Sequence, residues 1–76
     1  MMKVLRDYSS SSELVKAKLD PSRGNQWTIF TGDLKLGIIR DRGDYFKAIT
    51  MSPKINKSLY LSPQRILDDL EEMIIQ

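Results

Sequence analysis

The fold of this chain is decided by residues 26–50, which read QWTIFTGDLKLGIIRDRGDYFKAIT. β-branched and aromatic residues dominate this stretch, and two groups of turn-forming residues interrupt it. The first group is Gly32-Asp33, and the second is Asp41-Arg42-Gly43. This pattern predicts three antiparallel strands joined by two hairpins, with apolar side chains on both faces of the sheet.

The turns also predict a register, because loop length determines which residues lie opposite each other in a hairpin. A three-residue second turn places Arg40 opposite Asp44 and brings Phe46 and Ala48 to the face that carries Trp27. A two-residue first turn predicts three cross-strand pairs on that same face, which are Thr31–Leu34, Ile29–Leu36 and Trp27–Ile38.

Residues 62–75 predict an amphipathic α-helix that follows an irregular connection over residues 51–60. Ser62 can cap the helix, and Pro63 occupies a first-turn position where its missing N–H costs nothing. Leu61 and Ile66 have the spacing of a hydrophobic staple. The stripe expected to pack on the sheet comprises Ile66, Leu67, Leu70, Met73 and Ile74. It cannot bury both Ile74 and the adjacent Ile75 on one core face.

The N-terminal part fits more than one structure. Ser10 and Glu13 have the spacing of a helix capping box, which predicts a short helix over residues 13–19. The alternation of Val15, Ala17 and Leu19 with lysines predicts a strand over the same residues equally well. Residues 1–12 are expected to form an edge strand or to fray, and their apolar anchors are Val4, Leu5 and Tyr8.

The expected fold is α+β: a small antiparallel meander of three or four strands with a C-terminal helix packed on one face. The helical alternative for residues 13–19 adds a short N-terminal helix. No internal repeat or linker divides the chain, so residues 1–76 are expected to form a single domain. A chain of this size buries only about 60% of its unfolded surface, so small domains commonly add a disulfide, a metal or a partner subunit.

Composition narrows the possible functions. The chain contains no cysteine and no histidine, which excludes disulfides and the usual zinc ligands and removes the commonest general base and nucleophile. We therefore expect no enzyme activity, no cofactor and no metal site. No apolar run is long enough to span a bilayer, and nothing resembles a signal peptide, so we expect a cytoplasmic protein.

The net charge of +2 is unevenly distributed. Four of the ten acidic residues lie in the last nine positions, so residues 1–67 carry twelve basic and six acidic side chains, or +6. The sequence therefore predicts an acidic helix on an otherwise basic domain, with the acidic side chains interpreted as a solvated helix face.

The sheet face opposite the helix is the candidate functional surface, because one helix can cover only one face. Its candidate partner-binding residues are Phe30, Lys35, Ile39, Tyr45, Lys47 and Ile49. Three interpretations compete: the N-terminal segment covers this face, a protein partner or a second copy docks on it, or single-stranded nucleic acid binds it. The segment would use Leu14, Val15 and Leu19, whereas nucleic acid would stack on Phe30 and Tyr45.

We therefore expect a small non-enzymatic binding or accessory protein that acts through protein–protein interaction, including self-association. Its size is typical of accessory proteins of bacteria and phages. Nucleic-acid binding through the basic and aromatic residues of the outer face is the alternative function, with Lys35 and Lys47 neutralising phosphates.

Overall fold

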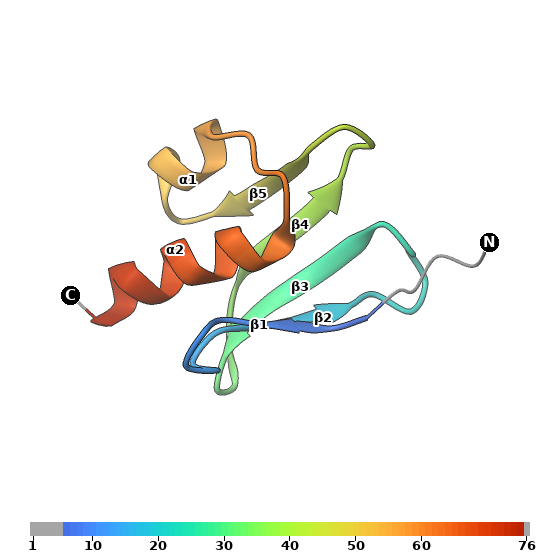
Figure 1. Cartoon of the computed structure of the whole chain (residues 1–76). Helices are drawn as coiled ribbons and strands as arrows, with labels where there is room; N and C mark the ends of the chain where they lie inside the picture. Colours follow the sequence, from blue (N-terminus) through green and yellow to red (C-terminus); the bar gives the residue numbers. More distant parts are fainter. Residues whose placement is uncertain (1–5, 76) are drawn as a thin grey trace.

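Five strands follow one another along the chain, and each pairs antiparallel with its neighbour in sequence (Figure 1). The computed structural model describes residues 6–75. Its elements are β1 (Tyr8–Ser9), β2 (Lys16–Leu19), β3 (Gln26–Thr31), β4 (Leu34–Asp41), β5 (Phe46–Thr50), α1 (Pro53–Lys57) and α2 (Pro63–Ile75). The predicted α+β fold is confirmed, and the sheet has five strands instead of the expected three or four.

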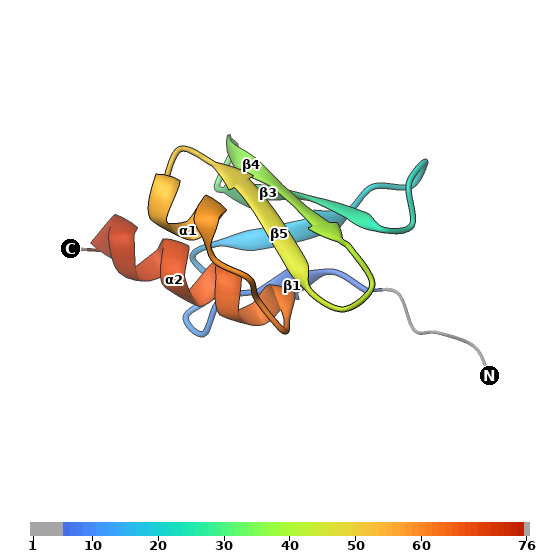
Figure 2. The ribbon, with the colours of Figure 1, turned by 90° about the horizontal axis from the view of Figure 1, so that it is seen from above.

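Helix α2 lies across one face of the sheet (Figures 1 and 2). We call this the helix-side face and the opposite one the outer face. Trp27 is buried on the helix-side face, where its ring centroid lies 6.0 Å from that of Phe46 and its Nε1 donates to the Arg6 carbonyl at 2.9 Å. The buried core comprises Val15, Ala17, Trp27, Ile29, Ile39, Ala48, Ile55, Tyr60, Ile66, Leu67 and Leu70. The predicted placement of Phe46 and Ala48 beside Trp27 is confirmed.

The register of β3 and β4 follows the sequence-based prediction only near the turn. Thr31 lies opposite Leu34, but a β-bulge adds one residue to β4 beyond this pair. Trp27 therefore lies opposite Ile39 instead of the predicted Ile38. A shift of one residue moves a side chain to the other face of a sheet. As a result Ile39, which was expected on the outer face, is fully buried on the helix-side face.

Gly37 makes this bulge possible. Its φ is 154°, and a Cβ at this position would collide with the carbonyl oxygen of Ile49 on β5. Ile29 lies opposite Gly37 and not opposite the predicted Leu36, which is the extra residue. Leu36 still packs against the core. The helix-side face therefore stays apolar, but beyond the bulge β4 contributes Ile39 to it instead of the predicted Ile38.

The loop between β4 and β5 is one residue longer than predicted. Asp41 pairs with Phe46, and Arg40 consequently lies opposite Lys47 instead of Asp44. The expected cross-strand pair of opposite charges is thus replaced by two cations on neighbouring strands. With this pairing Arg40 joins Lys47 on the outer face, which therefore carries one more positive charge than predicted.

Residues 13–19 form β2 and the end of the loop before it, so the strand alternative is correct and the helix is wrong. Ser10 does not cap a helix. Its Oγ accepts the N–H of Val15 at 2.9 Å, and its carbonyl accepts the N–H of Glu13 at 2.8 Å. Val15, just before β2, and Ala17 within it are completely buried on the helix-side face, as expected where apolar and polar residues alternate along a strand.

Residues 6–19 therefore extend the sheet sideways and do not cover the outer face. Leu19 lies opposite Trp27, and Val15 belongs to the helix-side core, so neither takes the role expected for it. Leu14 remains partly exposed. The expected anchors Val4 and Leu5 lie outside the described residues.

The free edge of β5 is closed by the segment that follows it. The N–H of Phe46 donates to the Tyr60 carbonyl at 2.7 Å, and the Tyr60 N–H returns a bond of 3.2 Å. Asn56 binds both backbone groups of Thr50 through its side chain. This segment contains α1, capped by Ser52, where the sequence predicted irregular structure. Because β1 at the other edge has two residues, neither edge of the sheet formed by residues 6–75 offers a long strand for pairing with another chain.

Helix α2 begins as predicted but without its staple. Ser62 Oγ accepts the N–H of Arg65 at 3.4 Å, and Pro63 opens the helix. Leu61 is 86% exposed, so it forms no staple with the buried Ile66.

Two carboxylates of α2 hold the β1–β2 loop. Asp68 Oδ1 accepts the N–H of Ser11 at 2.8 Å and its hydroxyl at 3.0 Å. Glu71 accepts the Ser12 hydroxyl and, at 3.3 Å, its N–H. Glu71 is buried, so the interpretation of a uniformly solvated acidic face is wrong for these residues. They stabilise the docking of the N-terminal hairpin on the helix.

Candidate functional site

The outer face is made by alternate residues of β2 to β5. Cross-strand pairing aligns them in three rows, which run across the strands. The rows are Lys16–Phe30–Lys35, Lys18–Thr28–Ile38–Ile49 and Gln26–Arg40–Lys47. Five of these ten positions are basic and none is acidic, so the strands give the outer face positive charge with uncharged side chains among the cations.

Phe30 is flanked by a lysine on each neighbouring strand. Lys16 lies directly opposite it on β2, and Lys35 lies directly opposite it on β4. Side chains that face each other in this way have Cβ atoms about 4.5–5.5 Å apart. The aromatic ring is half-buried, and both lysines are exposed. One ring with an ammonium group on either side can stack on a planar group and neutralise the anions beside it.

Most of these cations have no ionic partner among residues 6–75. Across the described residues, Lys16, Lys18 and Lys35 form no salt bridge. Arg40 Nε donates to Gln26 Oε1 at 3.2 Å, and Lys47 Nζ donates to the Asn56 carbonyl at 2.7 Å. Neither bond neutralises a charge. Uncompensated like charges on one face disfavour the folded state slightly and attract anions.

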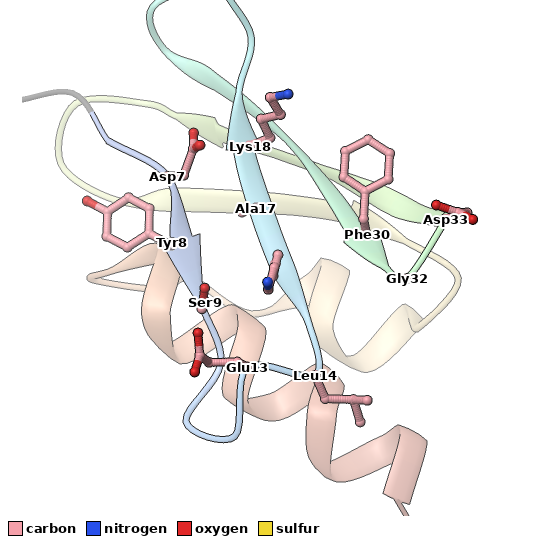
Figure 3. A pocket seen from close by; sticks show the side chains of 11 residues that line it. Asp7, Tyr8, Ser9, Glu13, Leu14, Ala17, Lys18, Phe30, Gly32 and Asp33 are labelled. Atoms are coloured by element: carbon pink, nitrogen blue, oxygen red, sulfur yellow. The ribbon is translucent and has the colours of Figure 1, made fainter.

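An open hollow of about 780 Å³ lies over the β1–β2–β3 side of this face. Its wall includes Phe30, Lys16 and Lys18, and Figure 3 shows Phe30 and Lys18 standing away from the sheet. Three carboxylates also line it, those of Asp7 before β1, Glu13 in the β1–β2 loop and Asp33 in the β3–β4 turn. The hollow therefore holds charges of both signs, with Lys16 and Lys18 on the sheet and carboxylates around them.

Two carboxylates near this surface have structural roles. Asp7 Oδ1 accepts the N–H of Leu19 at 2.8 Å, which ties the chain before β1 to β2. Asp20 accepts the N–H of Ser22 at 2.9 Å and its hydroxyl at 2.8 Å. These hydrogen bonds, the backbone one foremost, lower the pKa of Asp20. Both carboxylates thus hold local structure through Oδ1.

The structure brings together four of the six predicted site residues. Phe30, Lys35, Lys47 and Ile49 lie on the outer face. Tyr45 lies in the loop before β5 instead of in a strand. Ile39 is buried on the other face, and Ile38 takes its place because of the bulge.

Sequence reasoning missed three cations of this surface, which are Lys16, Lys18 and Arg40. The alternation of lysines with apolar residues over 15–19 was a signal for the first two, but only once β2 is accepted as a strand. Arg40 reaches the outer face only because the β-bulge shifts β4 by one residue, since the predicted register places it on the helix-side face with Ile38. It was overlooked because it was expected to pair with Asp44.

No other chemistry is visible in the described region. Within residues 6–75, no group of three or more acidic, histidine or cysteine side chains is placed to hold a metal ion. Every buried side-chain nitrogen or oxygen in that range has a hydrogen-bond partner, so none points to a missing ligand. The same residues include no helix that is both long and apolar enough to cross a membrane.

No protein-family model, curated protein or solved structure matches this chain.

Proposed function

We propose that this protein is a small non-catalytic binding protein whose outer face binds single-stranded nucleic acid. The observation that carries the proposal is the row Lys16–Phe30–Lys35, in which one aromatic ring is flanked on each side by a lysine that forms no salt bridge with residues 6–75. A base stacked on such a ring contributes about 1–3 kcal/mol by alanine substitution. The flanking lysines would neutralise the phosphates on either side of that base.

A single strand fits this face better than a duplex. The bases of a duplex are stacked on each other and cannot also stack on Phe30, whereas an unpaired base can. The carboxylates of Glu13 and Asp33 disfavour phosphates at the hairpin end of the hollow. The path with the most favourable charge thus runs from Phe30 toward Arg40 and Lys47, away from the β3–β4 turn.

A protein partner was the first expectation from the sequence, and the composition of the outer face now supports it less. Ile39 was one of the apolar anchors expected there, and it is buried on the helix-side face. Lys16, Lys18 and Arg40 add three cations instead. Ile49 remains 54% exposed, which favours a partner with acidic and apolar groups as the second candidate.

Binding to a labelled oligonucleotide, followed by fluorescence anisotropy over a range of salt concentrations, tests the proposal. For a single strand, the logarithm of the association constant is expected to fall with the logarithm of salt with a slope of up to about −3.5 if five cations each neutralise a phosphate. Lys16→Glu with Lys35→Glu should remove binding. Phe30→Ala should weaken it roughly fivefold to 150-fold, without flattening the salt dependence.

The matched control places the same change of charge away from the outer face. Lys57 on α1 and Arg65 on α2 are both exposed, so Lys57→Glu with Arg65→Glu alters net charge equally. This variant should retain most of the affinity. Absence of binding by the wild type at low salt ends the nucleic-acid proposal. Capture of an acidic protein that depends on Lys16 and Lys35 would then support the second candidate.

A further inference from the structure

The last turn of α2 carries apolar side chains that no described part of the chain covers. Met73, Ile74 and Ile75 are 47%, 43% and 68% exposed. The first two continue the stripe that buries Ile66 and Leu70, because they follow at helical spacing. Figures 1 and 2 show the reason: the C-terminal end of α2 extends past the strands, so the stripe outlasts the sheet it packs on.

A groove of about 230 Å³ lies beside this turn, between α1 and α2. Ile55, Tyr60 and Met73 contribute to its wall, and the exposed Lys54 and Glu72 belong to its rim. The groove therefore combines apolar and polar side chains. Its third charged group, Asp69, accepts the Tyr60 hydroxyl, whereas Lys54 and Glu72 have no ionic partner among residues 6–75.

We propose that this surface is a two-fold interface between two copies of the chain. In such an interface the same patch meets itself, so each residue contact occurs twice. Met73 of each copy would enter the groove of the other, and Lys54 of each would meet Glu72 of the other. Methionine suits this position because its flexible side chain adapts to an irregular apolar wall.

The charges favour a second copy over other occupants. An acidic partner would leave Glu72 facing a like charge, and a basic partner would do the same to Lys54. A membrane surface would require a predominantly basic rim, whereas here Asp69 and Glu72 accompany Lys54. In a two-fold arrangement Lys54 of each copy pairs with Glu72 of the other, so both charges find an opposite partner. The same contact covers the exposed last turn of α2. It would also extend the small core of a domain of this size.

Sedimentation equilibrium of the full chain at concentrations up to about 1 mM tests this interface. The wild type should dimerise, and Met73→Glu should yield a monomer. Lys54→Glu alone and Glu72→Lys alone should each weaken the dimer about tenfold, because each juxtaposes like charges twice. The double variant, Lys54→Glu with Glu72→Lys, should restore dimerisation, because the pairs then form with the signs reversed.

The control is Leu61→Glu, since Leu61 is equally apolar and exposed but lies outside the groove. This variant should dimerise like the wild type. Circular dichroism checks that each variant is folded. If Met73→Glu fails to fold, the two charge variants still test the interface, because Lys54 and Glu72 are exposed and their substitution leaves the core intact. A wild type that stays monomeric overturns the proposal, as does a dimer whose affinity the double variant fails to restore. Neither result depends on whether the outer face binds nucleic acid.

Discussion

The two faces of the sheet are built from alternate residues of the same strands, and they differ in almost every physical property. The helix-side face is apolar and buried, and it includes Ala17, Ile29 and Ile39, each fully buried. The outer face presents five cations and has no described element over it. Burial of apolar surface on the helix-side face contributes about 25 cal/mol per Å² to folding. The exposed cations of the outer face make no such contribution, so stability does not account for their presence.

This difference separates stability from function along a single strand. Neighbouring residues such as Lys16 and Ala17 are under opposite requirements, because one faces solvent and the other faces the core. Substitutions on the helix-side face are expected to change the free energy of unfolding. Substitutions on the outer face are expected to change binding. The predictions below test this separation.

The largest expected effect concerns Ile38 and Ile39, which are adjacent and lie on opposite faces. Ile39→Ala should cost about 2–5 kcal/mol of unfolding free energy, because it leaves a cavity in the buried core. Ile38→Ala should cost less than about 1 kcal/mol, because its side chain is only half-buried on the outer face. Urea unfolding measures both values. Equal losses, or a larger loss for Ile38→Ala, would mean that the β-bulge at Gly37 is absent.

This pair also marks where sequence reasoning stopped. The turn at Gly32-Asp33 was predicted correctly because two-residue hairpin loops require a residue with positive φ, and Gly32 has a φ of 59°. The bulge was missed because regular alternation continues equally well through Gly37. An isolated glycine within a strand pattern is itself a signal of a bulge. That signal indicates where the register can slip, but tertiary contacts decide whether it does.

The N-terminal hairpin could not be predicted for a different reason. The local pattern of residues 13–19 fits a helix and a strand, and the deciding interactions come from residues more than fifty positions away. Asp68 and Glu71 bind Ser11 and Ser12, and this binding is compatible only with the hairpin. Two of the cations on the outer face, Lys16 and Lys18, lie on β2, whose strand structure the local pattern left undecided, so the candidate site was only partly predictable.

The second prediction compares one charged residue from each side of the sheet, Glu71 and Lys16. Glu71→Ala leaves the Ser12 hydroxyl and N–H without their partner, so it should cost about 1–3 kcal/mol. Lys16→Ala removes an exposed and unpaired side chain and should change stability by no more than about 0.5 kcal/mol. Urea unfolding gives both values. Amide hydrogen exchange should show faster exchange in β1 and β2 for the first variant only.

A stable Glu71→Ala variant with unchanged exchange would contradict the assignment of α2 as the anchor of the N-terminal hairpin. The β1–β2 pairing would then hold through backbone bonds alone. The outer face would be unaffected in either case, because Lys16 and Lys18 need only the pairing of β2 with β3.

The smallest effect concerns Tyr60, which closes the β5 edge and donates a hydrogen bond of 2.7 Å to Asp69. Burial, followed by this bond, raises the pKa of Tyr60 to about 12. Tyr60→Phe removes this hydrogen bond and should lower the free energy of unfolding by about 1 kcal/mol at pH 7. The loss is no larger because the half-buried Asp69 carboxylate can bind water instead. Tyr45→Phe, in the loop before β5, is the matched control and should cost nothing measurable.

The raised pKa adds a dependence on pH with a definite sign. The unfolded phenol ionises near its ordinary pKa of 10.0, whereas the folded one stays protonated to about 12. The contribution of Tyr60 is therefore complete below pH 10 and is lost progressively as the pH rises toward 12. Other groups titrate in the same range, so the informative quantity is the difference in unfolding free energy between the wild type and Tyr60→Phe. That difference should shrink between pH 10 and 12, and a constant difference would show that the hydroxyl is not held by Asp69.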